Sequence, residues 1–503
     1  MTFRLALSIT SGILFGFAFP DVAQGWLMFV ALAPLLVAIH RSSSKREAFL
    51  LGWASQATSW LIMVPWVVRV MSHYGGLPVV TGWLIFIAMA LYLGLFGALF
   101  ALVVKRLNLG MRFTTWLLVP LAWAAIEFAR TYLFTGFPWN LAATSIIDYT
   151  SLIQIDRAGG PYFTGALVVL PSVVIAWWIT ERAAAIHRVI VAGSLGILFL
   201  VWWGTGLVAS KLIARPNAEP VVIAAMLQPN ISQQMRWDES NMMDIFRKMV
   251  DMTLAAAQHD AKVVIWPEST VPLSFTETDF YRDTIERISR DFDIDIILGS
   301  VATDPKHPNR IWNSAFLVSR GKTIGHYDKI RLVPFGEYVP LRRMLFFAEK
   351  LVHEVGDFEF GANDHPLRGA FAYGPAICYE IVYPQITRTQ IRNGADVIVT
   401  ITNDAWYDGT SAPMQHLWQA RLRAIEDDRS ILRAGTTGIS AFIDPTGRVI
   451  ESLPMGREGI IYARVQARRT MTPYVRFGDW FAWGALLVVL IRLIYARRNP
   501  ASS

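Results

Sequence analysis

The sequence predicts an α-helical membrane domain of about eight transmembrane helices joined to an α/β domain of ordinary polarity. Hydrophobic residues make up 53% of the 503 residues and charged residues 17%, below the roughly 25% of a soluble domain. The mean hydropathy is +0.37. Most of the apolarity lies in 1–210, whereas 211–475 has the composition of a soluble domain with its own core. We expect seven transmembrane helices in 1–210, the α/β domain in 211–475, and a last transmembrane helix with a short tail in 476–503.

Eight segments are long and apolar enough to cross a bilayer, which takes about 20 helical residues. Seven precede the α/β domain and one follows it: 4–20, 24–40, 48–71, 78–104, 113–134, 161–180, 188–210 and 478–496. The first segment is similar to a signal peptide, because Arg4 precedes its apolar run. The spans that follow directly favour a retained helix.

The loops predict the orientation of these helices. Lys and Arg gather before the first span and after the second, fourth, sixth and last, whereas the Gly75-Gly76 loop after the third has none. Since basic loops stay in the cytoplasm, both termini are expected there. The odd number of preceding spans carries the α/β domain to the outer face, the periplasm of a didermic bacterium. These loops hold many of the basic residues behind the net charge of +7, so the charge does not indicate a nucleic-acid partner.

Two charges interrupt the fifth expected span. Glu127 and Arg130 are three residues apart and therefore share a helix face. Charges at membrane depth are costly and are usually paired or functional. We interpret them as a structural ion pair, with contact to a polar lipid head group as the alternative.

Short apolar runs alternate with helical patterns in the second domain. Strands are expected at 220–227, 262–266, 295–299, 312–318, 322–326, 370–378, 395–402, 438–443 and 458–464. Helices are expected at 238–259, 279–291, 383–392 and 413–427, the first with Asp238 as its N-cap. This alternation is typical of an α/β domain with buried sheets.

Cys378 is the only cysteine and ends the expected strand 370–378. A free cysteine is often buried and inert. Glu268, however, follows the strand that ends at Trp266-Pro267, where partial desolvation gives a carboxylate the basicity of a general base. Lys329 is suited to stabilising an oxyanion. Taken singly, Glu268 and Lys329 are more often a surface acid and a solvated lysine, but a base, a cation and a thiol together indicate nucleophilic acyl chemistry.

The residues around these positions resemble a known family. Segment 329–337 (Lys-Ile-Arg-Leu-Val-Pro-Phe-Gly-Glu) is similar to the lysine motif of the nitrilase superfamily, and Cys378-Tyr379-Glu380 is similar to its nucleophile elbow. Thr402-Asn403-Asp404-Ala405-Trp406 follows as in that family. Bacterial apolipoprotein N-acyltransferases form the branch with membrane helices on both sides of this domain. Segments 228–231, 236–238, 335–340 and 414–417 resemble that branch, and the similarity covers nearly the whole chain.

The resemblance implies a nitrilase-like αββα sandwich in the periplasm and a two-step acyl transfer at the bacterial inner membrane. Its catalytic triad falls on Glu268 as base, Lys329 at the oxyanion and Cys378 as nucleophile. The implied acyl donor is a membrane phospholipid, with phosphatidylethanolamine favoured. The implied acceptor is the α-amine of the N-terminal diacylglyceryl-cysteine of a lipoprotein. No metal and no organic cofactor is implied, and we expect a monomer.

Further residues receive roles from the resemblance. Glu337 would orient Lys329 or Glu268, the Tyr379 N–H would assist at the oxyanion, and Glu380 would hold the site or the incoming amine. Candidates for substrate contact are Trp237, Asn313, Tyr338, Phe346 and Phe347. The two phenylalanines lie in an apolar stretch that suits a mobile lid, although core packing also accounts for them and for Trp237. His416 is expected to be a buried, hydrogen-bonded histidine, because the triad already supplies a base.

Two other classes of function compete with acyl transfer. A membrane-anchored nitrilase-type amidase or nitrile hydrolase would use the same triad and let water resolve the acyl-enzyme. The fused spans and the apolar stretch 341–361 argue against it. A transporter or binding protein would have an inactive soluble domain, and the intact triad and the lack of a run of intramembrane charges argue against that.

Overall fold

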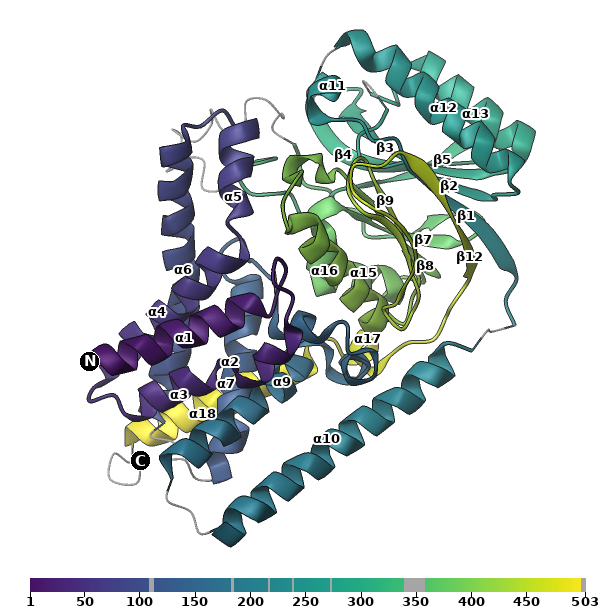
Figure 1. The fold of residues 1–503 in the computed structure, drawn as a ribbon. Helices are drawn as coiled ribbons and strands as arrows, with labels where there is room; N and C mark the ends of the chain where they lie inside the picture. The colour runs from purple at the N-terminus through teal and green to yellow at the C-terminus, as the bar shows by residue number, and fades with distance from the viewer. Residues whose placement is uncertain are drawn as a thin grey trace. The chain divides into compact units, whose positions relative to one another are not determined.

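The computed structural model describes residues 1–107, 113–181, 185–215, 218–237, 239–271, 274–338 and 358–498. The chain divides into two compact units, the first Met1–Leu212 with Phe477–Ser503 and the second Ile213–Arg476 (Figure 1). The boundaries expected after 210 and 475 differ from these by two residues and one.

The first unit is helical, and all eight expected spans overlap its helices. Its elements are α1 (Thr2–Phe17), η1 (Gly25–Leu27), α2 (Met28–Ala31), α3 (Ala33–His40), α4 (Lys45–Met63), α5 (Trp66–Arg69), η2 (Val70–Tyr74), α6 (Val79–Arg106), α7 (Phe113–Tyr132), η3 (Ala142–Ile146), α8 (Thr150–Ile153), α9 (Asp156–Thr180), α10 (Ala185–Ile213) and α18 (Trp480–Arg498).

Among the described residues, four helices are long and apolar enough to cross a membrane: Val79–Arg106, Asp156–Thr180, Ile186–Ile213 and Trp480–Arg498. Thr2–Phe17 and Gly25–His40 are apolar but shorter. α4 begins with Lys45-Arg46-Glu47 and carries several buried polar side chains, which lower its hydropathy. The expected count of eight spans is therefore not confirmed, although a helix is present at each expected position.

Glu127 and Arg130 join α7 to the segment that follows it. Arg130 Nη2 lies 3.7 Å from Glu127 Oε1, and Glu127 Oε1 accepts a hydrogen bond from the Ala142 N–H at 2.8 Å. Arg130 Nη1 donates to the carbonyl oxygens of Phe137 and Trp139 at 2.7 and 2.9 Å. These contacts bear out the interpretation of the two charges as a structural pair.

In the described part of the second unit the strands form two six-stranded sheets. The first has the strand order β12-β1-β2-β3-β4-β5 and the second β11-β10-β9-β8-β7-β6. The strands are β1 (Val221–Gln228), β2 (Val263–Ile265), β3 (Asp295–Asp304), β4 (His307–Ser319), β5 (Lys322–Asp328), β6 (Leu367–Arg368), β7 (Ala372–Ile377), β8 (Val397–Thr402), β9 (Ile431–Gly435), β10 (Ser440–Ile443), β11 (Val449–Leu453) and β12 (Gly459–Gln466).

Helices cover the outer face of each sheet, which gives an αββα sandwich (Figure 1). α12 and α13 pack on the first sheet, while α15 and α16 contact β7 and β9 of the second. The helical elements are α11 (Gln233–Trp237), η4 (Glu239–Asn241), α12 (Met242–Gln258), α13 (Asp279–Phe292), η6 (Cys378–Val382), α15 (Pro384–Arg392), η7 (Asp404–Tyr407), α16 (Ala412–Asp427) and α17 (Pro473–Phe477).

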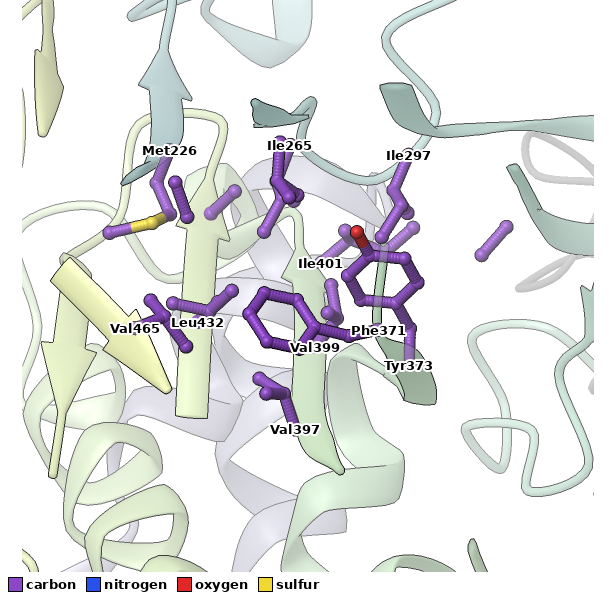
Figure 2. Packing of buried hydrophobic residues seen from close by; sticks show 14 of the residues in the cluster. Met226, Ile265, Ile297, Phe371, Tyr373, Val397, Val399, Ile401, Leu432 and Val465 are labelled. Atoms are coloured by element: carbon purple, nitrogen blue, oxygen red, sulfur yellow. The ribbon is translucent and has the colours of Figure 1, made fainter. Parts of the chain in front are cut away.

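The period-2 pattern of the strands separates two apolar layers. On β1, Met226 belongs to the cluster between the sheets, and Leu227 belongs to the cluster beneath α12 and α13. Figure 2 shows the inter-sheet cluster, where Ile265 of the first sheet and Val399 of the second are both buried. Cys378 lies in this inter-sheet cluster, so the packing of the two sheets fixes the strand end that carries the thiol.

Several elements differ from expectation, among them the short β6, α11 and α17, which were not expected. β9 was not expected, because Arg433 interrupts its apolar run, yet Arg433 is fully buried beside Asp404. β11 was missed because it is a largely exposed edge strand with little apolar signal. The first helix begins at Met242 rather than at the expected Asp238, which lies outside the described residues.

A buried carboxylate links the two sheets. Asp295, at the start of β3, accepts hydrogen bonds from the Tyr373 hydroxyl of β7 at 2.7 Å and from the Ala370 N–H at 2.6 Å. Asp295 is 5% exposed and Tyr373 is fully buried. Hydrogen bonds to charged groups contribute more than neutral ones, so this pair holds β3 and β7 in a defined relation.

Removing this hydroxyl tests the link. We expect Tyr373→Phe to lower the free energy of unfolding by about 2 kcal/mol, or Tm by roughly 4–8 °C for a domain of this size. The measurement is thermal unfolding of the detergent-solubilised chain, followed by fluorogenic labelling of Cys378, the single buried thiol. Tyr462→Phe on β12 is the control. It makes the same chemical change, and the described structure shows no hydrogen bond to the Tyr462 hydroxyl. If the two variants have the same Tm, the hydrogen bond between Tyr373 and Asp295 does not stabilise the fold as we expect.

Candidate active site

Cys378 lies at the turn from β7 into η6. Its φ angle is +51°, a left-handed conformation that costs energy for a non-glycine residue and recurs at functional sites. The Ile377 N–H donates to Glu380 Oε2 at 2.8 Å and holds the turn. With 7% of Cys378 exposed, the strained turn presents a nearly buried thiol.

Glu268 and Lys329 come from the ends of strands in the first sheet. Glu268 follows β2 and is 5% exposed, and Lys329 follows β5 and is 1% exposed. Lys329 Nζ lies 3.3 Å from Glu268 Oε1 and 2.8 Å from Glu337 Oε1. The charges of Glu268 and Lys329 both act on the Cys378 thiol. The three residues singled out in the sequence therefore lie in one buried cluster, together with Glu337.

The electrostatics of this cluster keep the thiol protonated at rest. Burial raises the pKa of Cys378 well above its ordinary value, the charge of Glu268 raises it further, and the charge of Lys329 opposes both. For Lys329, burial alone lowers the pKa, but Glu268 and Glu337 raise it well above its ordinary value. The lysine is thus a permanent cation, and the thiol needs a base before it can attack.

Asn313 bridges the two carboxylates. Its Nδ2 donates to Glu268 Oε1 at 2.7 Å and to Glu337 Oε1 at 3.0 Å. Glu337 Oε2 accepts from the Val333 N–H at 2.8 Å, and Glu268 Oε2 accepts from the Asn403 N–H at 2.8 Å. The amide nitrogen of Asn313 therefore lies against these carboxylates, whereas its Oδ1 has no hydrogen-bond partner in the described part of the chain. The expected contact of Asn313 with substrate stays a prediction.

Glu380 connects the lysine loop to the nucleophile turn. Its Oε1 accepts from the N–H groups of Ile330 and Arg331 at 2.7 and 3.0 Å, and its Oε2 accepts from Ile377 as described above. The Tyr327 hydroxyl lies 3.0 and 3.1 Å from the two oxygens. Because Ile330 adjoins Lys329 and Ile377 adjoins Cys378, this fully buried carboxylate sets the position of the lysine relative to the thiol.

The aromatic candidates are placed only in part. Tyr379 is 6% exposed, and its ring packs against Tyr383 with centroids 5.3 Å apart. Tyr338 packs edge-on against Phe360 at 5.1 Å. Trp237 ends α11, whose Gln233 accepts a hydrogen bond from Asn403 Nδ2 at 2.9 Å; nothing is described of the Trp237 side chain. Phe346 and Phe347 lie outside the described residues.

A second buried polar cluster adjoins the thiol. The sequence indicated its motif 402–406 and a buried His416, but not that these residues lie together beside Cys378. Thr402 Oγ1 lies 3.3 Å from Cys378 Sγ, and Asp404 pairs with Arg433 at 2.6 Å. His416 Nε2 lies 3.0 Å from the Cys378 carbonyl oxygen, so it is the buried, hydrogen-bonded histidine expected. Thr402 and Asp404 belong to the motif 402–406, which carried the resemblance but no role for either side chain.

Comparison with protein families assigns the class first. Residues 223–474 match the family model described as carbon-nitrogen hydrolase. Residues 11–174 match the apolipoprotein N-acyltransferase N-terminal domain. The α/β unit is therefore a carbon-nitrogen hydrolase domain.

Individual relatives identify one family within this class. The chain is 33% identical to the apolipoprotein N-acyltransferase of Geobacter metallireducens, over 98% of this chain and 95% of that protein. It is also 33% identical to the apolipoprotein N-acyltransferase of Methylococcus capsulatus, over 99% and 97% respectively. Among solved structures, a nitrilase-superfamily amidase of Nesterenkonia AN1 matches with a TM-score of 0.40 and 18% identity, over 52% of this chain and 96% of that one. This chain belongs to the apolipoprotein N-acyltransferase family.

The buried carboxylate of Glu380 predicts a pH dependence of stability. Burial raises its pKa from 4.5 to about 7, although hydrogen bonds from Ile377 and Arg331 lower it. Between these values the folded protein holds a proton that the unfolded chain has released, so stability is present at low pH and is lost as pH rises to about 7. We expect a higher Tm at about pH 5 than at about pH 7.5, and a smaller difference in Glu380→Gln, which has no such proton. The control is Glu451→Gln on the exposed edge strand β11, and a pH difference in Glu380→Gln as large as in this control would refute the prediction.

Proposed function

We propose that this protein transfers an acyl chain from a membrane phospholipid, through a thioester on Cys378, to the α-amine of the N-terminal S-diacylglyceryl-cysteine of a lipoprotein. The observation that carries the proposal is the buried cluster of Cys378, Lys329, Glu268 and Glu337 in a chain whose other unit consists of apolar helices. Both substrates are anchored in lipid, so an enzyme that is itself in the membrane meets them without extracting either into water.

The first half-reaction loads the thiol. Glu268 takes the proton from Cys378 Sγ, and the sulfur forms a bond to the ester carbonyl carbon of the phospholipid. The carbonyl oxygen becomes an oxyanion, which Lys329 Nζ stabilises together with the Tyr379 N–H. When the intermediate collapses, the ester C–O bond breaks and the lysophospholipid leaves with the proton from Glu268. Phosphatidylethanolamine is the proposed favoured donor.

The second half-reaction unloads the thiol. The α-amine of the lipoprotein attacks the thioester carbonyl, and Glu268 takes a proton from its nitrogen. The C–S bond breaks as the amide forms, and Cys378 recovers its proton from Glu268. The same base, cation and thiol therefore serve both halves of a ping-pong reaction, and no metal or organic cofactor has a step to perform.

The other residues take supporting roles in this proposal. Glu337 and Asn313 orient Lys329 and Glu268, as their distances of 2.7–3.0 Å support. Glu380 holds the lysine loop against the nucleophile turn. The proposed substrate contacts are Trp237, Asn313, Tyr338, Phe346 and Phe347.

The arrangement in the cell is also part of the proposal. We infer eight transmembrane helices in the inner membrane, with both termini in the cytoplasm and the catalytic domain, residues 211–475, in the periplasm. Seven of the helices belong to residues 1–210 and the eighth to 476–503. The basic loops and the helices at all eight expected positions support this arrangement, and we propose that the enzyme acts as a monomer.

Removal of the thiol tests the acyl-enzyme. We expect Cys378→Ala to abolish labelling of the purified chain by a phospholipid with a radiolabelled acyl chain, because no other cysteine exists. The wild-type label should be released by neutral hydroxylamine, which cleaves thioesters, and should pass to a diacylated peptide with a free α-amine. Cys378→Ser is the matched variant, and any label on its serine should resist hydroxylamine. Thioester-type labelling that persists in Cys378→Ala, or ammonia release from small amides without acyl transfer, would overturn the proposal.

Substitution of the base tests the first proton transfer. We expect Glu268→Gln to slow formation of the acyl-enzyme by roughly 10²–10⁴-fold, the usual contribution of a general base. The measurement is single-turnover labelling of Cys378 by the radiolabelled phospholipid. Glu451→Gln makes the same chemical change at an exposed position and should label at the wild-type rate. If Glu268→Gln does so as well, another group is the base.

A further inference from the structure

The hydroxyl of Thr402 lies between the nucleophile sulfur and a buried carboxylate. Thr402 ends β8 and is fully buried. Its Oγ1 is 3.3 Å from Cys378 Sγ and 2.8 Å from Asp404 Oδ1. A hydroxyl has one proton to donate and lone pairs to accept, so it can donate to only one of these two partners at a time.

The charge of Asp404 sets the direction of the Thr402 hydroxyl proton in the resting enzyme. Its Oδ2 accepts from Arg433 Nη2 at 2.6 Å, and both side chains are fully buried. Burial alone raises the pKa of Asp404, but the charge of Arg433 holds it well below its ordinary value. Asp404 is therefore an ionised acceptor, and a carboxylate attracts a hydroxyl proton more strongly than a neutral thiol does. In the resting enzyme Thr402 donates to Asp404, and its lone pair accepts the Cys378 S–H.

The same ion pair also fixes the backbone of the nucleophile. His416 Nε2 faces the Cys378 carbonyl oxygen at 3.0 Å, and because a carbonyl only accepts, Nε2 carries a proton. His416 Nδ1 faces Arg433 Nη2 at 3.1 Å. Burial and the charge of Arg433 lower the pKa of His416, which favours the neutral ring that accepts from Arg433. The backbone and the side chain of Cys378 are thus both held from the pair of Asp404 and Arg433.

We propose that Thr402 is a catalytic residue whose hydroxyl turns from Asp404 to the Cys378 sulfur and donates a hydrogen bond to the thiolate. The S–H bond breaks as its proton passes to Glu268, and the Thr402 proton then rotates about the Cβ–Oγ1 bond onto the negative sulfur. No covalent bond of Thr402 changes. A thioester sulfur is a weak acceptor, so the hydroxyl returns to Asp404 once the acyl-enzyme has formed. The interaction is strongest when the sulfur is negative, which is the condition for lowering a barrier.

The proposal rests on the assignment of Cys378 as the nucleophile, and it extends the proposed function by one residue. The titratable groups that act on the thiol come from several elements: Glu268 after β2, Lys329 after β5, and Asp404 and Tyr407 in η7. His416 of α16 contacts the Cys378 carbonyl oxygen rather than the sulfur. Thr402 adds to these an uncharged donor that directly contacts the sulfur.

The experiment measures thiolate formation without any acyl substrate. The full chain in detergent is alkylated with iodoacetamide at a series of pH values, and the single adduct on Cys378 is followed by mass spectrometry. Thr402→Val keeps the β-branched shape and removes the hydroxyl. The matched control is Thr400→Val, two residues earlier on the same face of β8, because Thr400 is equally buried and its hydroxyl has no hydrogen-bond partner in the described part of the chain.

We expect Thr402→Val to alkylate roughly ten- to a hundredfold more slowly than Thr400→Val at the same pH, as loss of one hydrogen bond to a charged group predicts. Equal rates in the two variants would overturn the proposal. If Thr402→Val does not fold, the comparison moves to Thr402→Ser and Thr402→Ala, of which only the serine keeps a hydroxyl. Faster alkylation of the serine variant supports the proposal, and equal rates overturn it. Because no phospholipid is present, a wild-type chain that fails to transfer acyl groups would refute the proposed function and leave this result standing.

Discussion

The site depends on one buried cation held between two carboxylates. Lys329 lies 2.8 Å from Glu337 and 3.3 Å from Glu268, and all three side chains are at least nine-tenths buried. An unpaired charge would be prohibitively costly there, whereas a paired and hydrogen-bonded one is tolerated. With both carboxylates ionised the cluster carries one net negative charge beside a neutral thiol. In the proposed first step, in which Glu268 takes the thiol proton, the total charge is unchanged and only moves from carboxylate to sulfur, so the surroundings need little reorganisation.

The two sheets of the sandwich supply different parts of this arrangement. The first sheet delivers Glu268 and Lys329 from strand ends, and the second delivers Cys378. Their relative position is therefore set by inter-sheet packing and by the few polar links that cross it. Glu380 is the most direct of these links, because it binds the backbone beside Lys329 and the backbone beside Cys378 at once. A site assembled in this way requires the fold to be formed before the chemistry is possible.

Residue type and position in the sequence were enough to find the members of the cluster but not their contacts. Glu268 and Cys378 were recognisable at the ends of apolar strands, and Lys329 was recognisable by the family motif 329–337. The contacts of Asn313 could not be predicted, because nothing in the sequence tells that β4 places its amide nitrogen between two carboxylates. β9 was missed because Arg433 reads as a surface residue until its partner Asp404, 29 positions earlier, is known. Strands with regular apolar runs, such as β8, were predictable because burial on both faces leaves a continuous hydrophobic signal.

Two polar clusters lie beside the Cys378 sulfur, one with Glu268, Lys329 and Glu337 and one with Asp404 and Arg433. Their charges fit the two proposed roles of the sulfur, as nucleophile and as leaving group. In the proposed mechanism Glu268 handles the proton and Lys329, paired with Glu337, stabilises the oxyanion. The charges of Asp404 and Arg433 sum to zero, and their hydrogen-bonded link to the sulfur runs through the Thr402 hydroxyl. A further fixed cation at that point would stabilise the thiolate permanently and so weaken it as a nucleophile. A hydroxyl that can turn toward or away from the sulfur stabilises the thiolate only while it exists, both when it attacks the ester and when it leaves the thioester. A neutral, reorientable donor is thus the type of group that suits an atom which must be nucleophile and leaving group in turn.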